Sequence, residues 1–152
     1  MSDFVFNIAK GKIAYYAGLP ATNDALIAVL LKTAGLETES TLKDYDNLSL
    51  LLAGTSDEAT FTNYVRKTLT GVTVTVDDTN DRVDISSAGI TWTSAGGADN
   101  TAVSKMIICY DDDTTGGTDT SLIPLFGLDA VFTPDGTDQA FTVTAPGFGR
   151  AA

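Results

Sequence analysis

KMIICYDDDTTGGTDTSLIPLFGL, residues 105–128, decides the fold, because two apolar runs flank a long acidic turn. Residues 106–109 form an unbroken apolar run of the length expected for a strand buried on both faces, and residues 122–126 form the returning run. Residues 111–119 are rich in aspartate, threonine and glycine, so they belong in water. The pattern predicts a β-hairpin at the centre of a sheet.

Short apolar runs along the rest of the chain favour further strands. Residues 72–77 alternate valine with threonine, which predicts a strand with one solvent-exposed face, and residues 83–85 return after a polar turn. Residues 25–31 have no polar face, so we prefer a buried strand there to the alternative, a capped helix. The other expected strands are residues 4–16 with a break at Gly11, a start within residues 65–69, residues 90–93, and a closing pair of residues 128–133 and 140–144.

One segment has the pattern of a helix. Residues 44–54 offer Asp44 or Asp46 as the N-cap, place leucines on one face and end at Gly54. A shorter helical turn is expected at residues 58–64, although its threonines have low helix propensity. Short strands at this spacing with one covering helix predict a mainly β, single-domain fold over all 152 residues, either an antiparallel β-sandwich or a barrel-like sheet.

Composition narrows the classes of partner. Hydrophobic residues make up 43% of the chain, so a core can form without disulfides. No apolar run approaches the ~20 residues that cross a bilayer, and we expect no membrane partner. The net charge of -11 repels phosphate backbones, so nucleic acid is not an expected partner. The opening residues lack a basic and apolar leader, so we expect synthesis in the cytoplasm.

Few residues offer catalytic chemistry. The chain has no histidine, which excludes catalytic triads that depend on imidazole and all histidine metal sites. Cys109 is the single cysteine, so a structural zinc site is excluded as well, and its apolar neighbours predict a buried, inert thiol. We therefore predict no catalytic residue and no cofactor, and we expect that the protein is not an enzyme.

Aspartate clusters are the weak candidates for a metal site. Asp111 and Asp113 lie in the acidic turn of the central hairpin, and Asp77 and Asp81 lie in another turn. The first pair, with a following glycine, matches the first half of a calcium loop, but the twelfth position is Leu122 instead of a bidentate glutamate. The motif fails, so we predict no metal site and interpret these aspartates as solvated turn residues.

The first twenty residues form a candidate interface arm or edge strand. An apolar, aromatic strand without an obvious local partner can pair with another chain. The alternative is that the same side chains belong to the core. The candidate interface residues are Phe4, Phe6, Ile8, Tyr15 and Tyr16.

Several short motifs, in one order along most of the chain, carry a resemblance to a known family. They are FVFNIAKG at residues 4–11, DYDNLSLLLA at 44–53, DDTNDR at 77–82, ITWT at 90–93, CYDDDT at 109–114 and PDG at 134–136. With these motifs the chain resembles small virion proteins of tailed bacteriophages, of the head decoration or minor capsid type. It departs from that type in the more apolar run of residues 25–31.

The resemblance implies a non-enzymatic structural protein of the virion, made in the host cytoplasm. Such a protein is expected to sit on the outside of the capsid in multiple copies and to stabilise the shell. The expected partners are the major capsid protein, copies of itself, or both, with a trimer as one arrangement.

Two other functions stay open at this point. The first is a tail tube, tail-tip or head-fibre subunit. The second is a carbohydrate- or Ca²⁺-binding β-module that uses Trp92 or the acidic turns. Because Trp92 lies within an apolar strand, we predict that it belongs to the core instead of a sugar platform.

Overall fold

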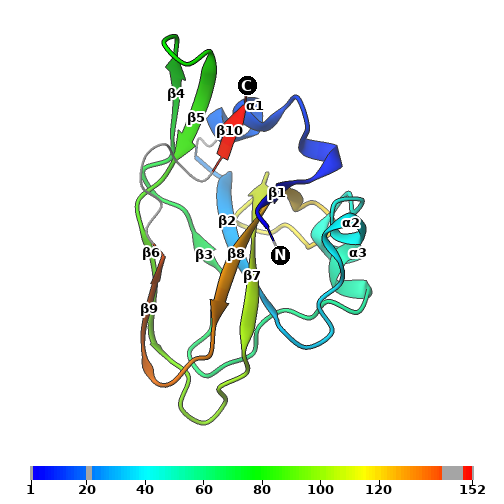
Figure 1. The fold of residues 1–152 in the computed structure, drawn as a ribbon, viewed down its shortest axis with the longest axis vertical. Helices are drawn as coiled ribbons and strands as arrows, with labels where there is room; N and C mark the ends of the chain where they lie inside the picture. Colours follow the sequence, from blue (N-terminus) through cyan, green and yellow to red (C-terminus); the bar gives the residue numbers. More distant parts are fainter. Residues whose placement is uncertain (1, 20–21, 142–148, 152) are drawn as a thin grey trace.

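The central hairpin predicted from residues 105–128 is confirmed in the computed structural model, which describes residues 2–19, 22–141 and 149–151 (Figure 1). Strand β7 (Val103–Asp111) pairs antiparallel with β8 (Ile123–Phe132). The acidic turn between them is exposed, as its composition predicts.

This hairpin lies in the middle of a five-stranded antiparallel sheet of order β1-β8-β7-β2-β3. Strand β2 (Ala25–Lys32) pairs with β7 along its whole length, so the prediction of a strand for residues 25–31 is confirmed. The two outer strands, β1 (Phe4–Val5) and β3 (Lys67–Thr68), are short. The chain is therefore mainly β and sandwich-like, with short helices packed around the sheet.

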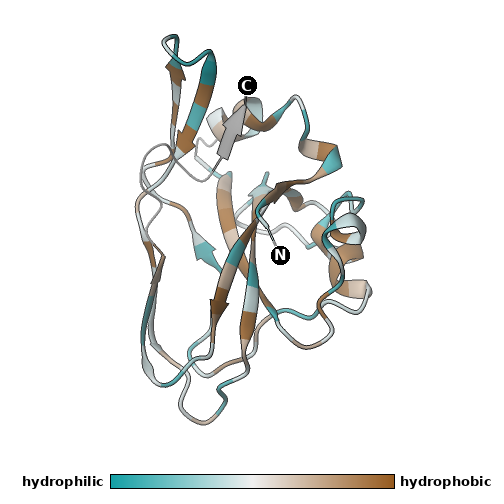
Figure 2. Cartoon of the chain, viewed as in Figure 1, coloured by the Kyte–Doolittle hydropathy of each residue, from teal (hydrophilic) through white to brown (hydrophobic). Residues whose placement is uncertain are grey.

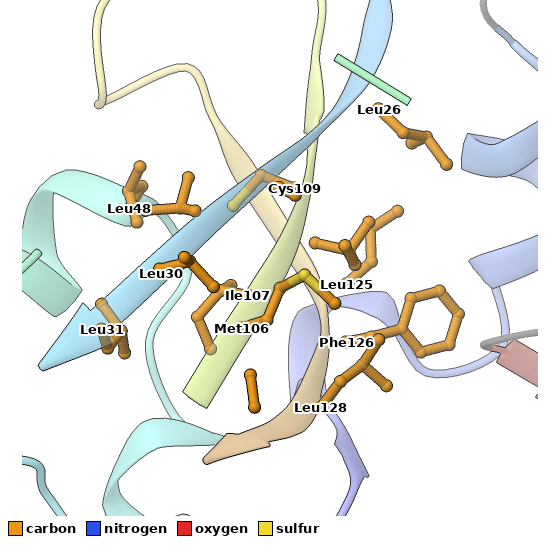
Figure 3. Close-up of a cluster of buried hydrophobic side chains, with 14 of the residues drawn as sticks. Leu26, Leu30, Leu31, Leu48, Met106, Ile107, Cys109, Leu125, Phe126 and Leu128 are labelled. Carbon is orange, nitrogen blue, oxygen red and sulfur yellow. The ribbon is translucent and has the colours of Figure 1, made fainter. Parts of the chain in front are cut away.

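Both faces of the central strands are covered, which explains their unbroken apolar sequence. All nine residues of β7 are buried, and successive side chains of a strand point to opposite faces. Helices α2 (Glu39–Leu42) and α3 (Leu48–Ala53) lie on one side of the sheet in Figure 1, and strands β6 (Ile90–Ala95) and β9 (Thr137–Phe141) lie on the other. Figure 3 shows the resulting cluster, in which side chains of β2, β7 and β8 meet Leu48 of α3.

The expectation of one covering helix is wrong, because the described residues form three α-helices and a 3₁₀ turn. Helix α3 is the predicted one, but Asn47 caps it: its side chain accepts a hydrogen bond from the Leu50 amide at 2.9 Å. The helical turn expected at residues 58–64 does not form, because this segment bonds to the edge of β2 instead. Leu31 of β2 pairs with Glu58, and the Leu30 amide donates to the Tyr64 hydroxyl at 3.1 Å. No helix in the described part of the chain is both long and apolar enough to span a membrane.

The opening segment also differs from its prediction. A strand over residues 4–16 is expected, but the strand ends at Val5 and continues as a 3₁₀ turn, η1 (Asn7–Ala9), and helix α1 (Ile13–Gly18). Phe6 and Ala9 are both fully buried at a spacing of three residues, which a 3₁₀ turn satisfies and an extended strand does not. Gly11 then turns the chain with φ +76°, a value that favours glycine.

The predicted closing pair of strands, residues 128–133 and 140–144, is wrong in its pairing. Strand β9 pairs with β6 instead, and residues 142–144 lie outside the described residues. The indole of Trp92 on β6 contacts β9: it is fully buried, as predicted, and packs edge-on against Phe141 with ring centroids 5.8 Å apart. Its Nε1 donates to the Val65 carbonyl at 2.8 Å, so the one polar atom of the indole is satisfied.

A second hairpin stands out from one end of the molecule (Figures 1 and 2). It consists of β4 (Thr73–Asp77) and β5 (Arg82–Ser86), and β10 (Gly149–Ala151) adds a third strand beside β5. The hairpin itself is confirmed, but the prediction that one face of β4 is covered is wrong. Its first four residues are all exposed, and we call the β4–β5 hairpin the ribbon below.

Candidate interaction surface

Helix α1 displays an aromatic side chain at the same end of the molecule as the ribbon. Tyr15 is 62% exposed, and its ring contacts that of Tyr16 edge-on with centroids 5.6 Å apart. The Tyr16 ring in turn lies 5.4 Å from that of Tyr110 on β7. These three side chains, which we call the tyrosine ladder, run from solvent to the central strand of the sheet.

The inner end of the tyrosine ladder is fixed by a hydrogen bond. The Tyr110 hydroxyl donates to Oδ2 of Asp24 at 2.9 Å. Burial, and then the bond to the Asp24 carboxylate and its negative charge, raise the pKa of Tyr110 to about 12. The phenol therefore stays protonated at neutral pH and keeps its donor role, so the ladder has a rigid base.

The other candidate interface residues are less accessible. Phe4 and Phe6 are buried and Ile8 is half-buried, so these side chains pack within the body of the protein. The Phe4 ring covers Gly127 on β8; a Cβ atom at that position would lie 2.5 Å from the ring. Of the five candidates, Tyr15 is the exposed one, and Tyr16 is half-buried behind it.

The first residues are not a separable arm, because polar contacts hold them on the sheet. Lys105 of β7 is fully buried, and its Nζ donates to the Ser2 carbonyl and to Oδ1 of Asp129, both at 2.7 Å. The Ser2 amide donates to the Glu39 carboxylate, which lowers the pKa of Glu39, and the Asp129 amide donates to Asp3 at 2.7 Å. The sequence signal for this cluster is a lysine directly before the apolar run of residues 106–109, and it was not among the predicted site residues.

The ribbon, which packs against α1, carries exposed valines. Val74 is 37% exposed and Val76 is 66% exposed, and α1 packs against β4 and β5. Figure 2 shows brown segments on the ribbon below its hydrophilic tip. Tyr15 and the ribbon valines therefore gather exposed apolar side chains at one end of the molecule, and this end is the candidate interaction surface.

Many of the aspartates shape turns. Three Asp-x-Thr segments share one geometry, in which an aspartate Oδ1 accepts hydrogen bonds from both the amide and the hydroxyl of the threonine two residues later. These bonds lower the pKa of each aspartate, since they favour the ionised carboxylate. The three segments begin at Asp99, Asp113 and Asp135.

The four weak metal candidates do not come together. Asp111 accepts a bond from the Asp113 amide at 3.1 Å, while Asp77 accepts from Asn80 and forms an ion pair with Arg82 at 3.1 Å. Asp81 is exposed in the turn of the ribbon. Within residues 2–19, 22–141 and 149–151, no group of three or more acidic or cysteine side chains is placed to hold a metal ion.

A charge network that the sequence did not reveal joins the central hairpin to the segment before β3. The Arg66 guanidinium contacts the carboxylate of Glu58 at 2.7 Å and that of Asp119 at 2.5 Å. Arg66 lowers the pKa of Asp119 through these bonds. Arg66 and Asp119 are separated in sequence by 53 residues, so only the fold shows that they pair. The network fixes the acidic turn on the body.

No family model, curated protein or solved structure matches this chain. The exposed surface at α1 and the ribbon, together with the motif resemblance, is therefore the basis for a functional proposal.

Proposed function

We propose that this protein is a non-enzymatic structural component of a tailed-bacteriophage virion that binds the outer surface of the capsid shell. The observation that carries the proposal is Tyr15, which is 62% exposed at the end of the tyrosine ladder. An aromatic side chain that is held in place before binding loses little conformational entropy on association, so it can anchor a protein interface. The virion setting rests on the resemblance of the sequence motifs to phage head proteins.

Two cations that precede Tyr15 in the chain favour an acidic partner surface, while the carboxylates of Asp24 and Asp112 act at the inner end of the tyrosine ladder, on Tyr110. Lys10 and Lys12 precede α1 and are both exposed, although the whole chain has a net charge of -11. Cationic side chains beside an aromatic anchor attract carboxylates and steer association, and the acidic remainder of the surface opposes other orientations. The protein would thus bind with α1 facing the shell.

The body of the protein suits this role. Its central sheet is buried on both faces and its first residues are fixed by Lys105, so α1 is presented on a rigid support. A protein that binds only the assembled shell stabilises that shell by mass action, without any chemical step. Multiple copies on one particle multiply this stabilisation.

The test is co-sedimentation of the purified protein with particles of the encoding phage that lack it. We expect the unmodified chain to sediment with capsids and Tyr15→Ser to lose at least tenfold in occupancy. Val131→Ser is the matched control, because Val131 is 79% exposed on β8, away from α1. Both variants should keep the melting temperature, since both side chains are exposed.

Other results would redirect or reject the proposal. Sedimentation with isolated tails but not with capsids would favour a tail tube or tail-tip subunit. Sedimentation with neither would reject a virion role. Equal loss of occupancy in both variants would show that Tyr15 is not the anchor.

A further inference from the structure

The outer edge of β4 is open to pairing. This strand ends the three-stranded sheet of order β10-β5-β4, and no strand of the described residues pairs with its outer edge. Thr73, Val74, Thr75 and Val76 are all exposed. Natural edge strands are protected by lysine, proline or a bulge, but β4 contains no lysine or proline, and its register with β5 is unbroken. The edge therefore has the features of an interface strand.

We propose that this edge pairs antiparallel with β4 of a second copy of the chain, about a two-fold axis through Thr75. The sequence of β4, TVTVD, is nearly symmetric about that residue. In this register Val74 of each copy lies opposite Val76 of the other, and Thr75 lies opposite itself. Opposed residues of an antiparallel pair share a face, so valine meets valine twice, as an isologous interface requires.

Charge also selects the antiparallel arrangement. The ribbon turn contains Asp78 and Asp81, and Asp77 precedes it. A parallel pairing would bring two acidic turns together, whereas the antiparallel one places them at opposite ends of the paired strands. The two Asp77 positions are then about 14 Å apart, at ~3.4 Å per residue, which exceeds the Debye length of about 8 Å at physiological salt. The Arg82 ion pair with Asp77 reduces the repulsion further.

Pairing would join the two ribbons into one sheet of order β10-β5-β4-β4-β5-β10. On the same face, Val76 and Val74 lie opposite Val83, which is half-buried, and Ile85, which is buried in the core, so the exposed part of the valine face belongs to β4. A single five-residue strand pair is a small interface, so the free protein should dimerise weakly. Copies fixed on one particle would pair far more readily, because their effective concentration is high. The inference extends the proposed function, but its test needs no particles.

Cysteine trapping tests the register. Thr75→Cys should form a disulfide-linked dimer under mild oxidation, because its two copies face each other on the axis within the Cα separation that a disulfide spans. Thr73→Cys is the matched control: its two copies would be about 14 Å apart, and it should remain monomeric. The native Cys109 should not compete, because it is buried and burial raises the pKa of its thiol. Equally fast trapping of both variants would overturn the antiparallel register.

Sedimentation equilibrium of the unmodified chain tests the dimer itself. Its weight-average mass should rise with concentration from 15.9 kDa toward twice that value. Val76→Lys should stay monomeric with an unchanged melting temperature, while Val131→Lys, an exposed substitution on β8, should dimerise like the unmodified chain. A trimer, or a monomer at every concentration together with no trapping of Thr75→Cys, would reject the proposal. Loss of capsid binding alone would leave it standing, since these measurements involve the isolated protein.

Discussion

The central hairpin β7–β8 and the ribbon β4–β5 are both antiparallel strand pairs joined by an acidic turn, yet their surroundings differ. All nine residues of β7 are buried, whereas four of the five residues of β4 are exposed. The sequences differ in the same way: β7 has a continuous apolar run, and β4 alternates valine with threonine. Both hairpins thus have paired backbone hydrogen bonds, and they differ in how far their side chains are buried.

Different interactions must therefore stabilise the two hairpins. Side chains above and below β7 exclude water, and apolar burial at about 25 cal/mol per Å² dominates its contribution. The ribbon depends more on pairs between its own strands, such as the ion pair of Arg82 with Asp77 at 3.1 Å and the hydrogen bond between the Thr73 and Ser86 hydroxyls at 2.7 Å. We conclude that β7–β8 holds the fold and that the ribbon is a surface element available for binding.

The largest loss of stability is expected when a side chain in the centre of the sheet is truncated. Ile107→Ala removes a fully buried side chain from β7 and should lower the free energy of unfolding by about 2–5 kcal/mol, because it leaves a cavity. Val76→Ala in the ribbon should change it by less than about 0.5 kcal/mol, because Val76 is exposed. Urea denaturation of both variants measures the difference. Equal losses would mean that the ribbon contributes to the core.

A smaller loss of stability is expected at Gly127, where the Phe4 ring packs against β8. Gly127→Ala places a Cβ atom 2.5 Å from that ring and must displace it, which should cost about 1–3 kcal/mol. Gly18→Ala is the control, because no atom lies within 4 Å of a Cβ atom at the end of α1. It should be neutral or slightly stabilising. Thermal melts compare the two, and partial recovery of Gly127→Ala by Phe4→Leu would show that the clash with this ring is the cause.

The sequence predicts the strands better than it predicts their partners. Continuous and alternating apolar patterns locate β2, β4, β5, β7 and β8, because burial imposes these periods on single segments. The pairing of β9 with β6 comes with a tertiary contact between Trp92 and Phe141, which the local sequence pattern does not reveal. The opening segment is missed for a local reason: its aromatic residues fit an extended pattern, but Gly11 adopts a positive φ and turns the chain into a helix.

The candidate surface could be predicted only in part. Adjacent tyrosines at positions 15 and 16 suggest an interface, but in the structure Tyr15 is exposed and Tyr16 is half-buried. Neighbouring side chains on a helix point about 100° apart, so the two cannot share one surface. The threonine-valine pattern predicts one covered face for β4, and no local signal shows that the body leaves it uncovered. Lys105 and Arg66 are recognisable only after the fold brings their carboxylate partners from distant segments.

Low pH should lower the free energy of unfolding, because it protonates a carboxylate of the Arg66 network. Arg66 lowers the pKa of Asp119 in the folded state below the value of about 3.9 in an unfolded chain. This carboxylate therefore contributes stability above that pH, and the contribution is lost as the pH falls through the folded pKa. Because Asp119 is 35% exposed, we expect Asp119→Asn to cost less than about 1 kcal/mol at pH 7 and to cost less at pH 3 than at pH 7.

Urea denaturation at several pH values checks this expectation. Asp57→Asn serves as the control at pH 7, since Asp57 is 65% exposed and its contact with Lys32 is 3.9 Å long. A cost for Asp119→Asn that stays the same at pH 3 would show that packing of the acidic turn, and not its charge, is responsible.

The smallest expected effect is confined to the ribbon. Arg82→Gln removes the cation that joins Asp77 and Asp84, which should cost about 0.5 kcal/mol. Because Ile85 is the one fully buried side chain of the ribbon and its other residues are exposed or half-buried, the ribbon should open locally without unfolding of the body. Hydrogen exchange should therefore become about twofold faster at the amides of β4 and β5 and remain unchanged in β7. Faster exchange in all three strands would instead mean that the ribbon and the central hairpin unfold as one cooperative unit, and the distinction between a fold-holding hairpin and a free binding element would fail.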